Sequence, residues 1–232
     1  MREILCAGFA ELGIHVDEQA AARFESYFDY LSERNKVMNL TAITGMEDVA
    51  RLHFLDSAAL LRFADMENKT VIDVGTGAGF PGLPLKIAEP SIELTLLDSL
   101  QKRVDFLSET CEKLALMDVA CIHARAEEAE ALREQFDFAV SRAVARLNVL
   151  CELCLPFVRP GGAFLAMKGP DPEAEIAEAR RAVAELGGVF GETCTYMIPG
   201  TEICHSVVVV KKTKITPAKY PRRFAKIQKS PL

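Results

Sequence analysis

The sequence lacks the features of exported and membrane-spanning proteins. Its apolar runs fall short of the roughly 18 residues that a membrane span requires. Acidic residues interrupt the short apolar stretch near its start, unlike in a signal peptide. Seven cysteines, an odd number at scattered positions, are typical of a reducing compartment. We therefore expect a cytoplasmic protein that makes no contact with a membrane.

Acidic residues are absent from the end of the chain. Residues 211–232 hold eight of the 27 basic residues and none of the 33 acidic ones, which leaves 19 basic residues for the rest of the chain. Such a basic tail is a candidate for contact with phosphate groups, and a solvated terminus is the alternative. Pro217, Pro221 and Pro231 argue against a helix there.

The distribution of apolar residues divides the chain into three parts within a single overall domain. Residues 1–68 form a helical extension, in which Asp17 is the expected N-cap of one helix and a second helix covers residues 46–63. Residues 69–212 alternate short apolar strands with helices, as in a mostly parallel sheet with crossovers. Residues 213–232 form the basic tail.

The predicted sheet has seven strands, and its end differs from the classical dinucleotide fold. The last two strands are separated by too few residues for a parallel crossover, which needs about a dozen, so we expect them to be antiparallel. This α/β pattern resembles the Rossmann-like fold of class I methyltransferases that depend on S-adenosylmethionine (SAM). A turn at residues 159–162 separates a helix over 144–157 from the fifth strand. The predicted strands cover residues 70–74, 93–97, 118–122, 136–140, 163–167, 193–197 and 205–211.

A glycine-rich loop follows the first strand. Taken alone, the pattern Gly-x-Gly-x-x-Gly from Gly77, with Asp98 about 20 residues on, fits the dinucleotide fingerprint, so NAD is one candidate ligand. Asp73, however, lies two residues before Gly75, and acid-x-Gly-x-Gly-x-Gly is the first motif of SAM methyltransferases. In those enzymes the glycines admit the methionine part of the ligand and the acid helps to organise the turn. No Gly-Lys-Ser/Thr sequence closes the loop, which excludes a Walker phosphate loop.

Two carboxylates are candidates for contact with the adenosine part of the ligand. Asp98 ends the second strand, where a carboxylate accepts hydrogen bonds from ribose hydroxyls. Capping of the next helix is its alternative role. After the third strand, the backbone of Ala126 and the carboxylate of Glu127 suit an adenine amino group. For Glu127 a solvated helix start is the alternative.

Six motifs together resemble the glucose-inhibited division protein B family over residues 35 to 212, and the basic tail resembles Gram-positive members. The resemblance implies a bacterial methyltransferase that modifies a guanine N7 of small-subunit (16S) ribosomal RNA, with SAM as cofactor and S-adenosylhomocysteine as product. In that family the cofactor is held by positions matching Gly75, Phe80, Ala126, Glu127 and Arg142. The motifs are Asn39-Leu40-Thr41, His53-Phe54-Leu55-Asp56-Ser57, Asp73 to Gly82, Leu96 to Ser99 followed by Lys102-Arg103-Val104, Val140 to Ala143, and Met167-Lys168-Gly169.

The chain lacks the machinery of other nucleic-acid methyltransferases. Amino-group enzymes carry an Asn/Asp-Pro-Pro-aromatic tetrad after the fourth strand, where this sequence has Ser141-Arg142-Ala143. No cysteine has the setting of a pyrimidine C5 nucleophile. Cys151 and Cys154 lie in an apolar helix without a second pair, so we expect core packing and no metal site.

Guanine N7 fits this absence of machinery. Its lone pair carries no proton, so attack needs no general base, and catalysis consists of alignment for in-line displacement. We therefore expect no catalytic residue beyond positioning groups. Because the base gains positive charge, a fixed cation beside it would hinder transfer. Arg142 is therefore expected to hold a phosphate or the cofactor carboxylate.

The residues that contact RNA are expected on the open side of the sheet and in the tail. Arg103 and Lys168 could meet phosphates there, and Asp56 is expected to pair with His53 or Arg51. For His53, hydrogen bonding within the fold is the alternative. Removal of the tail should weaken RNA binding without affecting SAM. The RNA-binding candidates are Asn39, His53, Arg103, Lys168, Lys219, Arg222 and Arg223.

We expect a monomer whose partner is small-subunit ribosomal RNA or the ribosomal subunit. Two other functions stay open. A non-catalytic RNA-binding assembly factor could have kept the fold. An NAD-dependent oxidoreductase is the other, although the chain has no evident Tyr-x-x-x-Lys set for hydride transfer.

Overall fold

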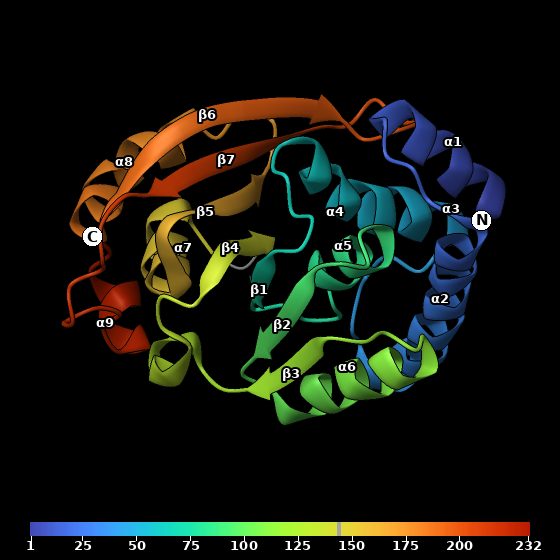
Figure 1. Cartoon of the computed structure of the whole chain (residues 1–232), viewed down its shortest axis with the longest axis horizontal. Coiled ribbons are helices and arrows are strands. Elements are labelled where there is room, and N and C mark those ends of the chain that lie inside the picture. Colours follow the sequence, from blue (N-terminus) through green and yellow to red (C-terminus); the bar gives the residue numbers. More distant parts are fainter. Residues whose placement is uncertain (143–144) are drawn as a thin grey trace.

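The computed structural model describes residues 1–142 and 145–232, and a seven-stranded sheet forms its centre (Figure 1). The strand order is β3-β2-β1-β4-β5-β7-β6. The first five strands pair in parallel, and β7 is antiparallel to both its neighbours, as predicted for the end of the sheet. The strands are β1 (Thr70–Val74), β2 (Glu93–Asp98), β3 (Val119–His123), β4 (Phe136–Arg142), β5 (Val158–Lys168), β6 (Gly188–Met197) and β7 (Cys204–Lys212).

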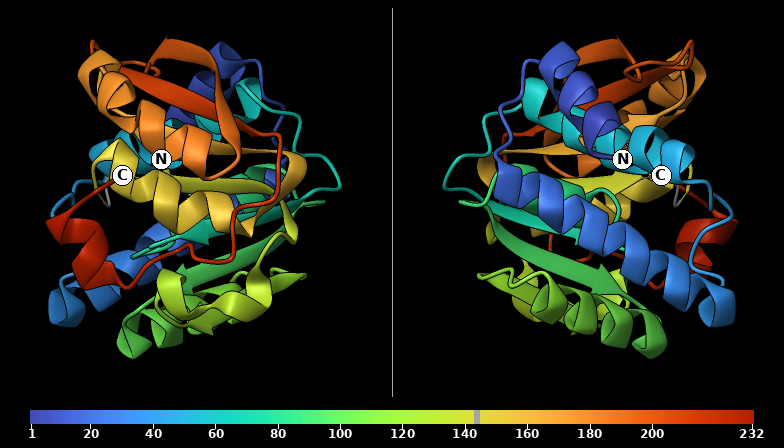
Figure 2. Two further views of the ribbon diagram at one scale, coloured as in Figure 1. Left: turned by 90° about the vertical axis from the view of Figure 1, so that its left-hand side faces the viewer. Right: turned by 90° about the vertical axis from the view of Figure 1, so that its right-hand side faces the viewer.

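Helices cover both faces of the sheet, and the alternation of side chains along the strands divides the core accordingly. In β1, Val71 belongs to the apolar cluster under the N-terminal helices, whereas Ile72 belongs to the cluster on the opposite face. Figure 2 views the molecule from these two sides. The first face carries α1 (Arg2–Leu12), α2 (Glu18–Met38), α5 (Gly82–Ala88) and α6 (Gln101–Lys113), and the second carries α7 (Leu147–Cys154), α8 (Glu173–Glu185) and α9 (Phe224–Lys229).

The N-terminal helices are part of the core and support the glycine loop. The carboxylate of Asp17 accepts a hydrogen bond from the backbone of Ala20 at 2.7 Å, which confirms the predicted N-cap of α2. The buried ring of Tyr27 stacks on Phe54 at 5.2 Å between ring centroids. Its hydroxyl donates to the carbonyl of Ala78 in the loop. The position of the loop therefore depends on packing against α2.

The helix predicted over residues 46–63 has the predicted extent but not a regular winding. A π-helical turn, Ala50–Leu55, lies between α3 (Met46–Val49) and α4 (Asp56–Ala58), and a 3₁₀ turn follows at Ala59–Arg62. Turns of this kind occur where a side chain or a functional site disturbs regular helical hydrogen bonding.

The turn predicted at residues 159–162 does not mark the start of the fifth strand. Phe136 pairs with Val158, and two residues later Phe138 pairs with Ala163, so residues 159–162 bulge out within β5. The strand starts before the turn because Val158 already pairs with β4. The preceding helix, predicted from residue 144, has its first predicted residue outside the described ranges, and α7 covers Leu147–Cys154.

The expectation that the tail contains no helix is wrong, because its prolines flank α9 and do not interrupt it. The guanidinium of Arg222 binds both carboxylate oxygens of Glu152 at 2.8 and 2.6 Å, and its backbone N–H donates to the same carboxylate. Tyr220 donates to Glu185, and Ile227 is fully buried. The tail is thereby fixed to α7 and α8.

We predict that Arg222→Ala releases the tail. The substitution leaves the buried Glu152 carboxylate without its cation, and detachment of the tail is the simplest way for water to reach it. Trypsin should then cleave within residues 213–232 faster than in the wild-type protein. Arg223→Ala, which removes an exposed neighbouring arginine, is the matched control. Equal cleavage of the two variants would contradict this role of the ion pair.

Candidate functional site

A cavity of about 470 Å³ lies at the carboxyl edge of the parallel strands. This edge is where open α/β sheets bind their ligands. The glycine loop forms one wall, and the segments that follow β2 and β3 form another. The cavity brings together seven of the eight predicted cofactor residues, namely Gly75, Gly77, Phe80, Asp98, Ala126, Glu127 and Arg142, together with the predicted RNA contacts His53 and Arg103.

Asp73, the remaining predicted cofactor residue, lies beneath the glycine loop and does not line the cavity. Its Oδ2 accepts hydrogen bonds from Thr76 Oγ1 at 2.6 Å and from the backbone of Gly82 at 2.8 Å. Burial raises the pKa of Asp73 to about 7, although both hydrogen bonds act in the opposite direction. Asp73 therefore supports the loop, the role that the motif gives to the acid, and its further assignment as a cofactor contact does not agree with the lining of the cavity.

Glycine is required in the loop for conformation and for space. Gly75, Gly77 and Gly79 have φ angles of 73°, 62° and 102°, which side-chain-bearing residues rarely adopt. A Cβ atom on Gly79 would lie 2.5 Å from Leu83 and 2.7 Å from the Tyr27 hydroxyl. The loop can keep this path only without side chains at these positions.

Asp98 links the glycine loop to the end of β2. Its Oδ2 accepts from the backbone of Gly77 at 2.9 Å, and its Oδ1 accepts from the backbone of Leu100 at 2.9 Å. Arg103 lies 3.4 Å from the same carboxylate. The alternative role, capping of the next helix, is not observed, because Leu100 is the N-cap of α6 and has no side-chain cap. Asp98 instead holds the loop and the turn before α6, and it lines the cavity. A carboxylate has about four acceptor positions, so it can still accept from a ligand hydroxyl.

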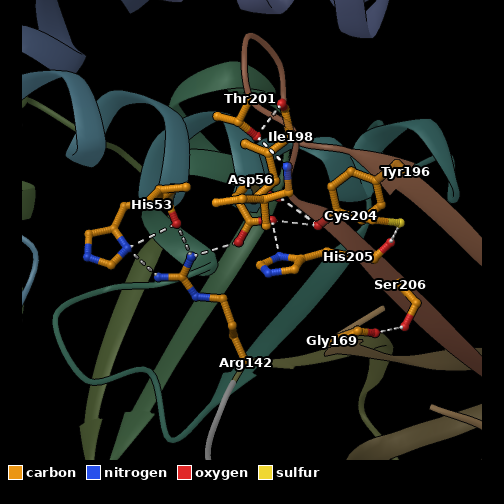
Figure 3. A network of polar contacts seen from close by, with 12 residues as sticks. His53, Asp56, Arg142, Gly169, Tyr196, Ile198, Thr201, Cys204, His205 and Ser206 are labelled. Carbon is orange, nitrogen blue, oxygen red and sulfur yellow. Dashed lines mark hydrogen bonds and ion pairs between the residues drawn. The ribbon is translucent and has the colours of Figure 1, made fainter. Parts of the chain in front are cut away.

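Arg142, at the end of β4, is held by a polar network (Figure 3). Its Nη1 donates to the carbonyl of Leu52 at 2.9 Å and to Asp56 Oδ2 at 3.1 Å. Its Nη2 lies 2.9 Å from His53 Nδ1, and its guanidinium lies over the ring of Phe80 at 5.0 Å. The π-helical turn therefore supplies two of the partners that orient Arg142. Of the motif Val140 to Ala143, Ala143 lies outside the described residues.

His53 is neutral in this network. Burial and the charge of Arg142 lower its pKa from 6.5 to about 4. Because Nδ1 accepts from Arg142, Nε2 carries the proton and donates to Thr41 Oγ1 at 2.8 Å. The imidazole stacks on Phe80 at 4.3 Å between centroids. His53 is therefore hydrogen-bonded within the fold, the alternative that the sequence left open.

Asp56 pairs with neither of its expected partners. Its Oδ1 accepts from Tyr196 at 2.7 Å and from His205 Nδ1 at 2.8 Å, in addition to the Arg142 contact on Oδ2 (Figure 3). Burial tends to raise the pKa of Asp56, but the hydrogen bond from His205 and the charge of Arg142 outweigh it and lower the pKa. Arg51, one expected partner, binds Glu47 instead.

A second cavity of about 460 Å³ adjoins the first, and His53 and Arg142 line both. Sequence reasoning missed two residues of this region, Tyr196 and His205. The sequence could have indicated His205, because it begins the predicted last strand. If that strand is antiparallel, it begins at the edge of the sheet where the parallel strands end. The second cavity is lined by Ile43, Leu52, His53, Asp56, Arg142, Met167, Lys168, Gly169, Ile203 and His205.

The predicted RNA contacts differ in how free their side chains are. Lys168 donates to Glu175 at 2.7 Å and to the carbonyl of Ala145 at 2.9 Å, with only 10% of its side chain exposed. Arg222 is bound to Glu152, as described above. We therefore correct both from phosphate contacts to structural residues. Asn39, Lys219 and Arg223 are exposed.

Within residues 1–142 and 145–232 there is no group of three His, Cys, Asp or Glu side chains that could hold a metal ion. Cys151 and Cys154 are buried and free. None of the helices in these ranges is long and apolar enough to cross a membrane.

Comparison with known proteins identifies the family and the fold. The family model GidB, described as rRNA small subunit methyltransferase G, matches residues 20–195. A Ribosomal RNA small subunit methyltransferase G from Alkaliphilus metalliredigens is 49% identical over 99% of this chain and 98% of its own. One of the same name from Alkaliphilus oremlandii is 47% identical over 100% and 99%. A SAM-dependent methyltransferase structure from Aquifex aeolicus, 21% identical, matches 70% of this chain and 92% of its own with a TM-score of 0.53. The predicted class I fold is confirmed.

The low pKa of His53 predicts a pH-dependent loss of stability that His53→Asn should remove. Asparagine keeps an acceptor for Arg142 but cannot gain a proton. Because the pKa of about 4 in the folded protein lies below the ordinary 6.5, the unfolded chain binds the proton first as the pH falls. The free energy of unfolding of the wild-type protein, relative to the variant, should fall by up to about 3 kcal/mol between pH 6.5 and 4.

Urea unfolding at stepped pH measures this difference. The raised pKa of Asp73 has the opposite effect, because it makes the protein less stable as the pH rises. Both proteins contain Asp73, so the difference between them cancels this contribution. A difference between the two proteins that stays constant over this pH range would contradict a neutral, desolvated His53.

Proposed function

We propose a reaction for this chain on the premise that it belongs to the GidB family, the family of rRNA small subunit methyltransferase G. Membership confirms the resemblance drawn from the six sequence motifs. A methyltransferase acting on small-subunit ribosomal RNA is the activity that its relatives' names support. The methyl donor, the atom that is methylated and the residues that position it are what we propose.

The first cavity fits SAM, with S-adenosylhomocysteine as the product. Its volume of about 470 Å³ lies in the range of sites for ligands of this size. The glycine loop lets a ligand approach the backbone closely. The carboxylate of Asp98 suits ribose hydroxyls, and Ala126 and Glu127 suit the adenine amino group. When bound, SAM would supply an electrophilic methyl group on a sulfonium.

The target guanine fits the second cavity. The observation that carries this assignment is the shared wall, because His53 and Arg142 line both cavities. Nδ1 of His205 is bound to Asp56, which leaves Nε2 for a ligand in the second cavity. A base in this cavity would therefore meet an oriented hydrogen-bonding group on one side, and the methyl donor where the two cavities meet beside His53 and Arg142.

The electrostatics of the shared wall suit attack by guanine N7. This atom has no proton to lose, so the side chains need only align it with the methyl group. The base gains positive charge as the methyl group moves. A cation at the wall would oppose this change, but the Arg142 charge is paired with Asp56 at 3.1 Å, and His53 is neutral because its pKa is about 4. Arg142 can thus stand beside the base, contrary to the expectation from sequence.

The RNA around the target would contact exposed residues near the site. Asn39 lies next to the cavity residues Leu40 and Thr41, and Lys219 and Arg223 are exposed on the tail. We propose that these side chains contact the RNA backbone, that the protein acts as a monomer, and that it works in the cytoplasm on ribosomal RNA or the small subunit. The assembly-factor alternative requires that no methyl transfer occurs. The oxidoreductase alternative is disfavoured by the family.

Methyl transfer from radiolabelled SAM tests the reaction. The substrate is ribosomal RNA, or small subunits, from cells that lack this protein. We expect label in the RNA and a single site of chain cleavage after borohydride and aniline treatment, which cut at 7-methylguanosine. Label without such a site would contradict methylation at N7, and the absence of label from both substrates would favour the assembly-factor alternative.

Arg142→Ala should lower the rate of transfer by about 100-fold or more, since a misplaced wall disturbs the alignment of donor and acceptor. Arg51→Ala is the matched control. Arg51 lies on the π-helical turn that binds Arg142, but its own side chain binds Glu47 and the carbonyl of Pro199, away from both cavities. Single-turnover rates should separate the two variants. Full activity of Arg142→Ala would rule out the proposed role of Arg142.

A further inference from the structure

One wall of the first cavity comes from the end of the chain. Phe224, the first residue of α9, lines the cavity together with Leu153 of α7 and with residues 124–127 after β3. Phe224 is half-buried against the apolar cluster that contains Leu153. The sequence did not predict this contact, because the tail was expected to contain no helix and either to contact phosphates or to be solvated.

Phe224 is held in place by contacts that are independent of its own ring. Two residues before it, Arg222 is bound to the buried carboxylate of Glu152. Further back, Arg133 donates to the backbone carbonyls of Tyr220 at 2.6 Å and Pro217 at 3.2 Å. The start of α9 is therefore a fixed part of the cavity.

The surroundings of Phe224 have the chemistry of a purine site. An aromatic ring and the aliphatic side chain of Leu153 offer apolar surface to a planar base. The carboxylate of Glu127, with 10% of its side chain exposed, lines the same cavity and can accept from an amino group. Asp98, the proposed ribose partner, lines this cavity as well. Base stacking on an aromatic side chain is a common source of affinity.

We propose that Phe224 binds the adenine of the methyl donor, so that the tail is part of the cofactor site. This inference rests on the proposed function, which assigns SAM to the first cavity. It reverses the expectation that removal of residues 213–232 would leave SAM binding intact. The exposed Arg223 and Lys226 lie on the same segment. Contact of this segment with RNA would therefore take place beside the residue that binds the base of the cofactor.

Calorimetric titration with two ligands tests the proposal. S-adenosylhomocysteine contains adenine and the amino-acid part, whereas 5′-deoxy-5′-methylthioadenosine contains adenine but lacks the amino-acid part. Phe224→Ala should weaken the binding of both by the same factor, about tenfold, the order expected for one lost base stack. Phe224→Tyr should restore most of the affinity. Lys226→Ala, an exposed change on the same helix, should leave both affinities unchanged.

The results separate this proposal from the assignment of the cofactor. If the wild-type protein binds neither ligand, the cofactor assignment fails and this inference falls with it. If the wild-type protein binds both and Phe224→Ala binds them equally well, only this inference is overturned. It is also overturned if Phe224→Ala loses affinity for S-adenosylhomocysteine alone, because the ring would then act on the amino-acid part. Phe224→Leu, which keeps apolar packing, replaces the alanine variant if that one does not fold, with the same decisive outcomes.

In turnover, Phe224→Ala should raise KM for SAM by a similar factor and leave kcat at saturating SAM unchanged. A purely structural loosening of the site would lower kcat as well, because the alignment of donor and acceptor would suffer. A fall in kcat with unchanged KM for SAM would contradict the binding role.

Discussion

The site depends on one buried ion pair, between Arg142 at the end of β4 and Asp56 after the π-helical turn. Asp56 is 1% exposed, and its carboxylate also binds Tyr196 and His205 from the last two strands. The pair therefore joins the N-terminal helices, the centre of the sheet and its antiparallel edge. Loss of one partner would leave a charge in the interior, a change that costs about 3–5 kcal/mol. The shared wall of the two cavities exists because this pair fixes Arg142.

The same pair explains the electrostatic character of the site. Burial and the charge of Arg142 lower the pKa of the adjacent His53, and Asp56 balances the charge of Arg142. The wall that the two cavities share is thus polar, oriented and close to neutral. A reaction that creates positive charge on a base without proton transfer needs such a wall more than it needs a general base. The expectation of no catalytic residue beyond positioning groups and the ion pair in the structure both fit the N7 reaction that we propose.

Features that depend on neighbours in sequence could be predicted, and features that depend on distant partners could not. The strand Thr70–Val74, the glycine loop and the antiparallel end follow from local apolar patterns and connection length. The π-helical turn does not, because its carbonyl at Leu52 binds Arg142, 90 residues away. The helix in the tail was missed for the same reason, since its anchor, Glu152, lies 70 residues before Arg222. Lys168 was taken for a phosphate contact because its charge is visible in the sequence, whereas its bond to Glu175 is not.

The most direct test of the account is a crystal structure of the protein with both S-adenosylhomocysteine and guanosine monophosphate. We expect the sulfur at the glycine loop in the first cavity and the guanine in the second cavity beside His205. Guanine N7 should be directed at the sulfur, next to Arg142 and His53. The ion pair between Arg142 and Asp56 should be intact. A guanine bound outside the second cavity, or an Arg142 side chain that leaves Asp56 to bind the nucleotide phosphate, would contradict it.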